Sequence, residues 1–281
     1  MKELREIVAL WEKHRGGCAF VTLVRVTGSS YRRPGARMLI TSSGETAGAL
    51  SAGCIEDELA MHARDVIANG APKLLRFDTR RRFGCNGSIE VFVERVDAEF
   101  MSWLRDKITA RQPFELAAEF FVQTIEPAIQ LLVFGDGADA TVLLKQAQLL
   151  GWDAHTFSAI TELGVEVDDR TAVVIATHNF GRDCAALRYL LPLSLRYVGL
   201  VGPRRRREEL LLDVIDSGAA MRSQLFAPAG LHLAAETPEE IALSIISEIQ
   251  AVFAGGTAEH LRDRKLPIHA NSPAECAMPA H

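Results

Sequence analysis

Residues 128–150 read Ala-Ile-Gln-Leu-Leu-Val-Phe-Gly-Asp-Gly-Ala-Asp-Ala-Thr-Val-Leu-Leu-Lys-Gln-Ala-Gln-Leu-Leu, and they decide the fold class. The apolar run over 128–134 predicts a buried strand, and residues 141–150 predict a helix. Between them, Gly135, Gly137 and Ala140 have the GxGxxA spacing at which a Rossmann unit rests a pyrophosphate on the N-terminus of its helix. Strand, glycine turn and helix in this order predict the first unit of a Rossmann-like sheet.

The residues that follow repeat this alternation of strand and helix. They predict strands over 172–176 and 197–201, and helices over 182–191 and from Pro203 onward. Alternation of this kind indicates a parallel, doubly wound sheet with helices on both of its faces.

The length of 281 residues suggests about two domains, and Glu126-Pro127 is the expected boundary between them. We place an N-terminal α+β domain at 1–126 and the Rossmann-like domain at 127–257. The residues 258–281, which contain several prolines and no periodic pattern, predict a flexible C-terminal tail.

The N-terminal domain combines short strands with helices. An amphipathic helical pattern ends at Gly16-Gly17, and strand patterns rich in Val, Phe and Thr follow it. In chain order we expect strands over 18–27, 37–41, 45–50, 73–78, 88–96 and 114–123, with helices from Cys54 to Asn69 and over 97–110.

A small-residue turn that includes Gly53 brings Cys54 to the N-terminus of its helix. Unpaired N–H groups and the positive end of the helix dipole lower the pKa of a thiol and attract anions. Glu56, Asp57 and Glu58 act in the opposite direction and raise the thiol pKa. Two interpretations stay open, a reactive thiolate or anion site and a small, buried apolar side chain.

A loop over 28–35 carries Arg32 and Arg33 among turn-forming residues, so it is a candidate for binding a phosphate. A second basic loop begins with Arg80 and Arg81 and leads into the turn from Gly84 to Gly87. Positive charge beside the thiol of Cys85, within that turn, favours the thiolate. For the arginines themselves, a solvated surface loop is the alternative.

The glycine turn at 135–140 is compatible with three interpretations: bound NAD(P), another phosphorylated ligand, or a turn needed for the fold alone. A nicotinamide dinucleotide site expects an acid about 20 residues after the turn. The second strand instead ends at His155–Ser158 without one. Asp136 and Asp139 add negative charge beside the expected phosphate position.

Thr177 and His178 follow the strand at 172–176, at the carboxyl end where doubly wound sheets bind ligands. His178 is the acid–base or ligand-orienting candidate, with a satisfied core histidine as the alternative. Arg204 and Arg205 begin the next helix with two further arginines, where positive charge opposes the helix dipole. A bound anion would offset that cost, and a solvated face is the alternative.

Composition excludes several classes of protein. A net charge of -5 and a pI near 5.9 leave no global basic field for nucleic acid or an anionic membrane. The five cysteines lack CxxC spacing, the N-terminus lacks a signal peptide, and no apolar run approaches the ~18 residues of a membrane span. We therefore expect a cytoplasmic protein with reduced thiols and with no metal site made by its side chains alone.

These motifs resemble the XdhC and CoxI family of maturation factors for xanthine dehydrogenase and carbon monoxide dehydrogenase. The loop from Gly28 to Met38 is similar to the first loop of that family, Gly53-Cys54-Ile55-Glu56 to its Gly-Cys-Ile/Leu-Glu signature, and Gly84-Cys85-Asn86-Gly87 to its Cys-Gly-Gly turn. The segments 177–178, 199–202, 227–231 and 236–245 extend the resemblance to the second domain. Ala52 and Asn86 depart from the family's more glycine-rich pattern and would narrow the approach of a bulky ligand.

The resemblance implies binding of the molybdenum cofactor, as molybdopterin or molybdopterin dinucleotide, support of its sulfuration, and insertion into an apo molybdenum hydroxylase such as xanthine dehydrogenase. It favours a chaperone over a catalyst and implies a cysteine desulfurase as sulfur donor; we also expect a homodimer. On this interpretation the ligand-binding residues are Arg32, Arg33, Gly53, Cys54, Arg80, Arg81, Cys85, Gly87, Gly135, Gly137, Thr177, His178, Arg204 and Arg205, with Cys54 or Cys85 on the molybdenum.

Two structural expectations follow: Cys54 and Cys85 converge on one site, and arginines of both domains hold the phosphate end of the ligand between them. The alternative function is an NAD(P)-dependent oxidoreductase that uses the GxGxxA turn, with His178 as proton donor. The absence of an acid near Ser158 counts against this alternative.

Overall fold

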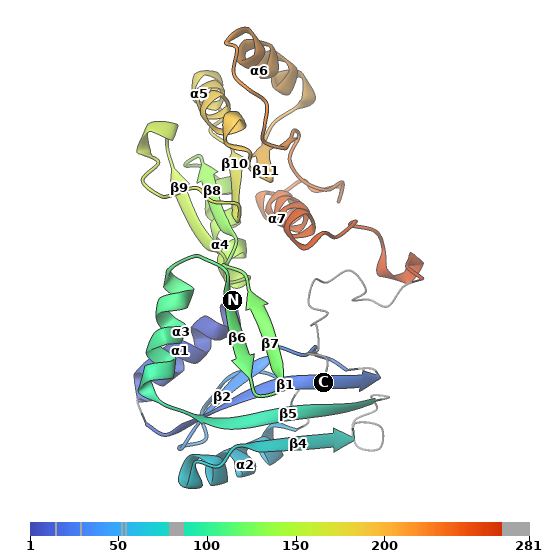
Figure 1. Cartoon of the computed structure of the whole chain (residues 1–281). Coiled ribbons are helices and arrows are strands. Elements are labelled where there is room, and N and C mark those ends of the chain that lie inside the picture. The colour runs from blue at the N-terminus through green and yellow to red at the C-terminus, as the bar shows by residue number, and fades with distance from the viewer. Residues whose placement is uncertain (15, 29, 52, 54, 79–86, 266–281) are drawn as a thin grey trace. The chain divides into compact units, whose positions relative to one another are not determined.

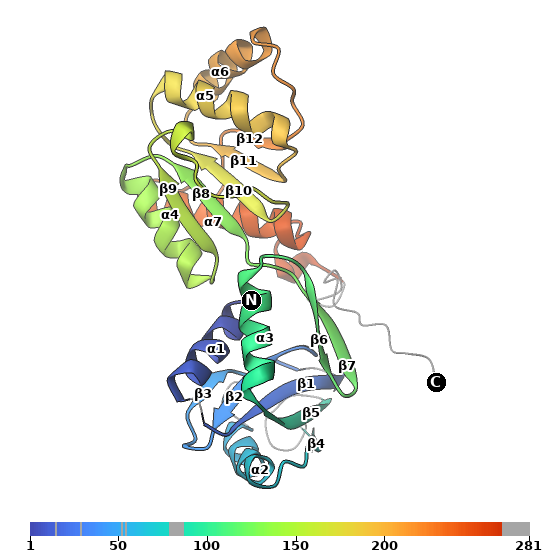
Figure 2. The ribbon, with the colours of Figure 1, turned by 60° about the vertical axis from the view of Figure 1, so that its left-hand side comes forward.

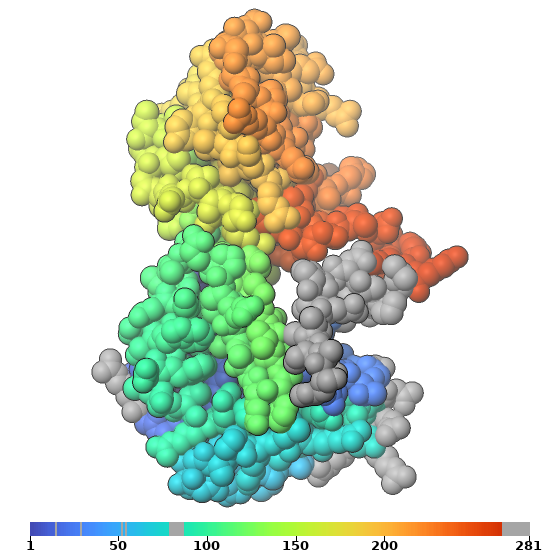
Figure 3. All heavy atoms as spheres, viewed as in Figure 1, coloured from blue at the N-terminus to red at the C-terminus, as the bar shows by residue number. Residues whose placement is uncertain are grey.

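The computed structural model describes residues 1–14, 16–28, 30–51, 53, 55–78 and 87–265. The chain divides into two units, one spanning Met1–Pro127 and the other beginning at Ala128. Figure 3 shows the heavy atoms of both units, coloured by position along the chain.

The first unit contains a five-stranded antiparallel sheet with the order β3-β2-β1-β5-β4, and a separate hairpin of β6 and β7 (Figure 1). Its elements are α1 (Lys2–His14), β1 (Cys18–Gly28), β2 (Arg37–Thr41), β3 (Thr46–Gly48), α2 (Glu56–Asn69), β4 (Lys73–Asp78), β5 (Gly87–Val96), α3 (Ala98–Thr109), β6 (Phe114–Ala118) and β7 (Phe121–Ile125). The strands expected at 37–41 and 73–78 are confirmed with the same bounds.

β1 is the central strand, and its residues from Cys18 to Val24 are buried on both faces. Successive side chains of a strand point to opposite faces. Ala19 and Val21 therefore pack in the core formed with α2, whereas Cys18 and Phe20 pack in the core formed with α1 and α3. Helices thus cover both faces of the sheet (Figure 2), which explains the nearly continuous apolar sequence of β1.

The single strand expected over 114–123 is wrong. The chain turns back at Glu119 and Phe120, and β6 pairs with β7 in antiparallel register with Ala118 opposite Phe121. Neither turn residue is Gly, Pro, Asn or Asp, so the turn carries no local sequence signal. The apolar pattern on either side therefore resembled one uninterrupted strand.

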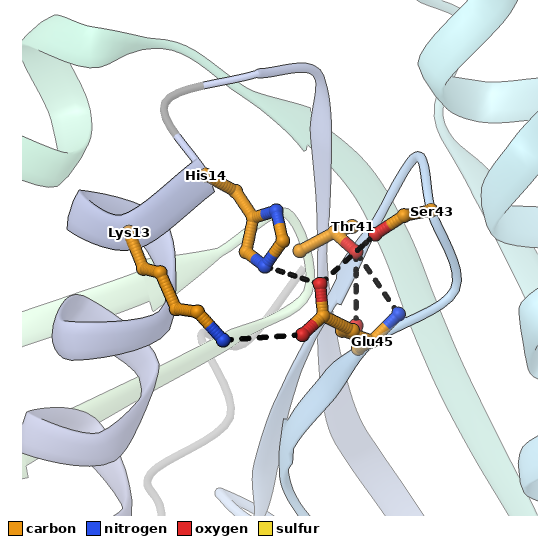
Figure 4. A network of polar contacts seen from close by, with 5 residues as sticks. All are labelled: Lys13, His14, Thr41, Ser43 and Glu45. Atoms are coloured by element: carbon orange, nitrogen blue, oxygen red, sulfur yellow. Dashed lines mark hydrogen bonds and ion pairs between the residues drawn. The ribbon is translucent and has the colours of Figure 1, made fainter.

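The turn between β2 and β3 is fastened to the C-terminal end of α1 by Glu45 (Figure 4). The carboxylate of Glu45 is 3.5 Å from Lys13 Nζ, accepts a hydrogen bond from Ser43 Oγ at 3.2 Å and contacts His14 Nε2. The backbone N–H of Glu45 donates to Thr41 Oγ1 at 3.0 Å. This network closes the end of the sheet away from the carboxyl ends of β1, β3 and β4.

The second unit is a parallel sheet with the order β12-β11-β10-β8-β9. Its strands and α-helices are β8 (Gln130–Phe134), α4 (Ala138–Leu149), β9 (Asp153–Phe157), β10 (Thr171–Ile175), α5 (Phe180–Leu190), β11 (Tyr197–Leu200), α6 (Arg204–Asp216), β12 (Leu225–Phe226) and α7 (Pro238–Ala254). Short 3-10 turns lie at Ile160–Glu162, Leu191–Leu193 and Leu261–Asp263.

Helices pack on both faces of this parallel sheet. Leu131 and Val133 of β8 share a core with α4 and α7, whereas Leu132 and Phe134 share one with α5 and α6. The expected fold class, an α+β unit followed by a Rossmann-like, doubly wound parallel sheet, is confirmed. None of the helices in the described part of the chain is long and apolar enough to cross a membrane.

Candidate functional site

In the sheet of the first unit, the three strands that lead into the candidate loops point the same way. β2 lies between β3 and β1, β5 lies between β1 and β4, and every neighbouring pair is antiparallel. β1, β3 and β4 therefore run in the same direction. The carboxyl ends of β1 and β4, at Gly28 and Asp78, therefore lie at one end of the sheet, and the arrows of β1 and β4 point the same way in Figure 1. β3 points toward that end but stops short of it, because Gly48 is opposite Met38, which is opposite Val21 of β1. Gly87, the first residue of β5, is paired with Gly28 at this end.

The segments that follow β1, β3 and β4 contain most of the site residues predicted for the first domain. Cys54, Arg80, Arg81 and Cys85 lie outside the described residues, so the convergence of the two thiols stays a prediction. Gly53 is exposed with φ +103, a conformation that favours glycine, and a Cβ at this position would meet open space.

Arg32 has a definite partner. Its Nη1 and Nη2 donate to the two carboxylate oxygens of Glu3, at the start of α1, at 2.6 and 2.8 Å. This bidentate geometry is the one by which Arg also holds phosphate, so a phosphate at Arg32 has to compete with Glu3. The neighbouring Arg33 accepts a hydrogen bond from Ala36 N at its backbone carbonyl.

Glu56 organises the turn before α2, whereas the sequence analysis treated it as an acid of the first helical turn and as part of the family signature. One carboxylate oxygen accepts from Ser51 N at 3.0 Å, and the other accepts from Ser51 Oγ at 2.7 Å and Ile55 N at 3.0 Å. Burial acts to raise the pKa of Glu56, but these hydrogen bonds outweigh it and the pKa is lowered. The sequence signal for this role of Glu56 is its position directly after Ile55, the N-cap of α2, whose apolar side chain cannot cap the helix.

In the second unit, β8 lies between β9 and β10, which is where the strand order reverses. Doubly wound sheets bind ligands at the carboxyl ends of the strands at this point. A Cβ on Gly135 would lie 2.5 Å from the carbonyl oxygen of Ala176, so glycine is required for the close approach of the two loops. Gly137 is the N-cap of α4 and has open space where a side chain would be.

Thr177 and His178 follow β10 at the same end of the sheet. His178 Nε2 lies 3.2 Å from Asp139 Oδ2, in the first turn of α4, and the His178 side chain is 61% exposed. The structure thus places His178 beside the glycine turn. The sequence analysis had assigned both to the same ligand.

Thr177 leads instead to a buried carboxylate that sequence reasoning missed. Its Oγ1 lies 2.5 Å from Asp183 Oδ1, and Asp183 is only 1% exposed. Arg206 completes the group, with Nη2 and Nε at 2.6 and 3.1 Å from Asp183 Oδ2. This Thr177–Asp183–Arg206 group joins the end of β10 to the first turns of α5 and α6.

The arginine run at the start of α6 therefore divides by role. Arg206 is the member that contacts Asp183, whereas the sequence analysis selected Arg204 and Arg205. Arg205 Nε bonds Glu209 one turn along the same helix at 3.0 Å, and its side chain is 89% exposed. Arg205 and Arg206 have different roles because their side chains point in different directions around α6. Those directions depend on how α6 packs within the unit.

The side chain of an acidic residue lies at the end of β9, although residues 155–158 include no acid. Glu162, in the 3-10 turn after β9, accepts a hydrogen bond from Ser158 N at 2.8 Å through Oε2. The tight turn returns the carboxylate to the strand end. The lack of an acid at residues 155–158 therefore does not by itself count against a nucleotide at the end of β9.

Among the described residues, no group of three or more His, Cys, Asp or Glu side chains could hold a metal ion. Cys184 is buried, and burial, together with a hydrogen bond to Asp213, raises its pKa to about 11. Such a thiol is a poor nucleophile at neutral pH.

Comparisons with known proteins agree with the fold of the two units. A family model described as the XdhC and CoxI family matches residues 11–78, and one described as the XdhC Rossmann domain matches residues 131–249. The chain is 27% identical to a probable xanthine dehydrogenase subunit of Bacillus subtilis (strain 168), over 81% of this chain and 91% of the relative. It is 23% identical to the molybdenum cofactor insertion chaperone PaoD of Escherichia coli (strain K12), over 84% of this chain and 83% of that protein.

A solved structure has the same fold along nearly the whole chain. It is a crystal structure described as a xanthine dehydrogenase from Bacillus halodurans, with a TM-score of 0.79 and 24% sequence identity. The match covers 94% of this chain and 98% of the other. At this level of identity it shows a shared fold.

Proposed function

Because this chain belongs to the XdhC and CoxI family, we propose that it is an accessory factor for a molybdenum hydroxylase such as xanthine dehydrogenase. It binds the molybdenum cofactor, as molybdopterin or its dinucleotide, supports the sulfuration of this cargo and inserts it into the apo-enzyme. The similarity to a molybdenum cofactor insertion chaperone supports this role.

One structural observation carries the proposal. β1, β3 and β4 point toward the same end of one sheet, so the three connecting segments that follow them start in a common direction, although these segments are far apart in sequence. They contain Arg32 and Arg33, Cys54, and Arg80, Arg81 and Cys85. Arginine suits the phosphate of a pterin cofactor, and thiolates suit its sulfur-bearing metal centre.

Within this site we assign the thiols of Cys54 and Cys85 to the molybdenum end of the cargo. Gly53 and Gly87 leave room for the backbone to approach it. The four arginines Arg32, Arg33, Arg80 and Arg81 hold the phosphate end. Glu56 supports the turn before α2 through its hydrogen bonds to Ser51 and Ile55.

In the second unit, we propose the glycine turn and the end of β10 as a nucleotide-binding site. Gly135 and Gly137 open the N-terminus of α4, and Thr177 and His178 face the same end of the sheet. We retain Arg204 and Arg205 as candidate phosphate ligands, since both are exposed at the start of α6.

The second candidate function is an NAD(P)-dependent oxidoreductase that uses the GxGxxA turn and His178. The observation in its favour is the Glu162 carboxylate at Ser158 N, because an acid at the end of the second strand suits a ribose hydroxyl. Against it, Asp136 and Asp139 carry negative charge at the turn where the pyrophosphate would lie.

The test is a pair of titrations of the purified full chain, one with molybdopterin and one with NADH and NADPH, followed by absorbance and by mass spectrometry of the bound species. Binding of the pterin at micromolar concentration or below, together with activation of an apo molybdenum hydroxylase, supports the chaperone. Binding of NAD(P)H without pterin binding supports the oxidoreductase and overturns the proposal. A Cys54→Ser and Cys85→Ser pair, with Cys184→Ser as control for a buried thiol, tests the assigned thiols.

As an insertion factor, the protein acts in the cytoplasm, docks on the apo-hydroxylase and receives sulfur by way of a cysteine desulfurase. We propose that it does so as a homodimer. Light scattering at micromolar concentration tests this state, and a monomeric mass contradicts it.

A further inference from the structure

Arg37 is a buried cation at the first position of β2, directly after the segment that carries Arg32 and Arg33. The residue is only 3% exposed. Burial lowers the pKa of Arg37 to about 10, while the negative charges of Glu3 and Glu94 act in the opposite direction. Placing a guanidinium here costs solvation free energy, so its contacts indicate what the charge does for the structure.

Those contacts join the loop to the β6–β7 hairpin. Nη1 donates to the carbonyl oxygen of Gly35 at 2.9 Å and to Oε1 of Gln123, on β7, at 2.6 Å. Nη2 donates to the carbonyl oxygen of Leu116, on β6, at 3.3 Å. Leu116 and Gln123 are opposite each other in the hairpin, so one side chain connects the end of the loop to both hairpin strands.

Gly35 fits this contact because it lacks a side chain. Its φ is +95, and a Cβ would lie 2.7 Å from Cδ of Gln123. The backbone of Gly35 also donates to Leu23 O at 2.8 Å, and Leu23 N donates to Ala36 O at 2.9 Å. The loop therefore ends in a fixed position between β1 and the hairpin.

The charge of Glu3 acts on both arginines of this region. Its carboxylate is held in the bidentate pair with Arg32, and its field also favours the charged form of Arg37. Polar residues of α1 and the hairpin thus contact both ends of the segment 32–37, with Glu3 bound to Arg32 and Gln123 bound to Arg37. The apolar neighbours Leu39 and Ile40 supply the packing of β2.

We propose that Arg37 is a positioning residue that holds the 30–36 segment, and with it Arg32 and Arg33, against the β6–β7 hairpin through Gln123 and Gly35. Its effect on cargo binding rests on the proposed function, in which these arginines meet the phosphate of the cofactor. The order of the loop does not depend on that function. Arg37 itself acts through the loop and needs no contact with the ligand.

The experiment uses Gln123→Leu and the conservative Gln123→Glu, which keeps an acceptor for Arg37, with Arg37→Met as a third variant. Arg25→Ala is the matched control, since Arg25 of β1 pairs with Glu90 at 3.3 Å and its side chain is 54% exposed. The first readout is amide hydrogen exchange over residues 30–36, compared with β1 and β5, and the second is molybdopterin titration.

We expect Gln123→Leu to speed exchange over 30–36 at least tenfold and to weaken molybdopterin binding by roughly tenfold, with exchange in β1 and β5 unchanged. Gln123→Glu restores both, and Arg25→Ala stays within about twofold of wild type in both. Unchanged exchange over 30–36 in Gln123→Leu overturns the proposal. Faster exchange throughout the first unit also overturns it, because it would mean that the contact stabilises the whole unit and does not position the loop in particular. If wild type binds no pterin, the proposed function fails while the exchange data still decide the role of Arg37. If Arg37→Met does not fold, the two Gln123 variants still decide it.

Discussion

Arg37 in the first unit and Asp183 in the second are both buried beside a loop predicted to bind ligand, but their charges and partners differ. Arg37 is 3% exposed and donates to two carbonyls and an amide. Asp183 is 1% exposed and is held by a guanidinium and a hydroxyl. The cation is thus held by neutral acceptors, and the anion by an opposite charge.

This difference predicts different responses to substitution. Removing one neutral acceptor from Arg37 leaves its other hydrogen bonds in place. Removing Arg206 leaves Asp183 as a buried anion without its cation, which is among the costliest changes in a folded protein. The loop of the first unit should therefore loosen locally, whereas the site of the second unit should lose stability as a whole.

Among the substitutions that test this comparison, Arg206→Met should have the largest effect on stability. It should lower the free energy of unfolding by about 3–5 kcal/mol, because Asp183 is left without its ion pair. Urea denaturation measures the loss, with Arg205→Met as the matched control from the same helix turn. Adding Asp183→Asn to Arg206→Met should recover part of the stability, since the unpaired charge is removed. A loss below about 1 kcal/mol for Arg206→Met would show that Asp183 is not energetically coupled to it.

Paired glycine substitutions sharpen the comparison at the two loops. Gly135→Ala places a Cβ 2.5 Å from the backbone oxygen of Ala176, whereas Gly35→Ala meets the side chain of Gln123, which can move. We expect a loss of about 3 kcal/mol or more for Gly135→Ala and about 1–2 kcal/mol for Gly35→Ala, measured by denaturation. Combining Gly35→Ala with Gln123→Ala should reduce the cost of the glycine substitution. Equal costs at both glycines would contradict the distinction.

Glu56 extends the comparison to a partly exposed charge that titrates. Its folded-state pKa is lowered, so its stabilising contribution is present above the unfolded-state pKa and is lost as pH falls through the folded-state pKa. Glu56→Gln should therefore cost about 1 kcal/mol at pH 7, and the difference from wild type should vanish at pH values below the folded-state pKa. Denaturation over this pH range measures the effect. A difference that persists unchanged in acid would mean that ionisation of Glu56 does not contribute.

The smallest expected effect on stability is that of Arg205→Ala. Its pair with Glu209 is exposed and lies one helical turn away, so the free energy of unfolding should change by less than about 0.5 kcal/mol. Thermal melting and molybdopterin titration together give the useful contrast with Arg206. Weaker binding at unchanged stability would support Arg205 as a phosphate ligand, and unchanged binding would mark it as part of a solvated face.

Sequence reasoning was accurate where the signal was local. The strands at 37–41 and 73–78, and the order of strand, glycine turn and helix around Gly135, follow from periodicity and from residues a few positions apart. The β6–β7 hairpin was missed because Glu119 and Phe120 form its turn without any turn-forming residue. The candidate loops were found because arginine, cysteine and glycine stand together in short segments.

The sequence by itself determined the two-part architecture, the Rossmann-like unit and the family resemblance, since each depends on short motifs and on their order. Only the tertiary structure decided the partners of the charged residues. Arg37 and Gln123 are 86 positions apart, Glu3 and Arg32 are 29 apart, and Asp183 and Arg206 are 23 apart. A buried charge is stable only where distant elements complete its hydrogen bonds, and local spacing carries no record of which elements will meet there.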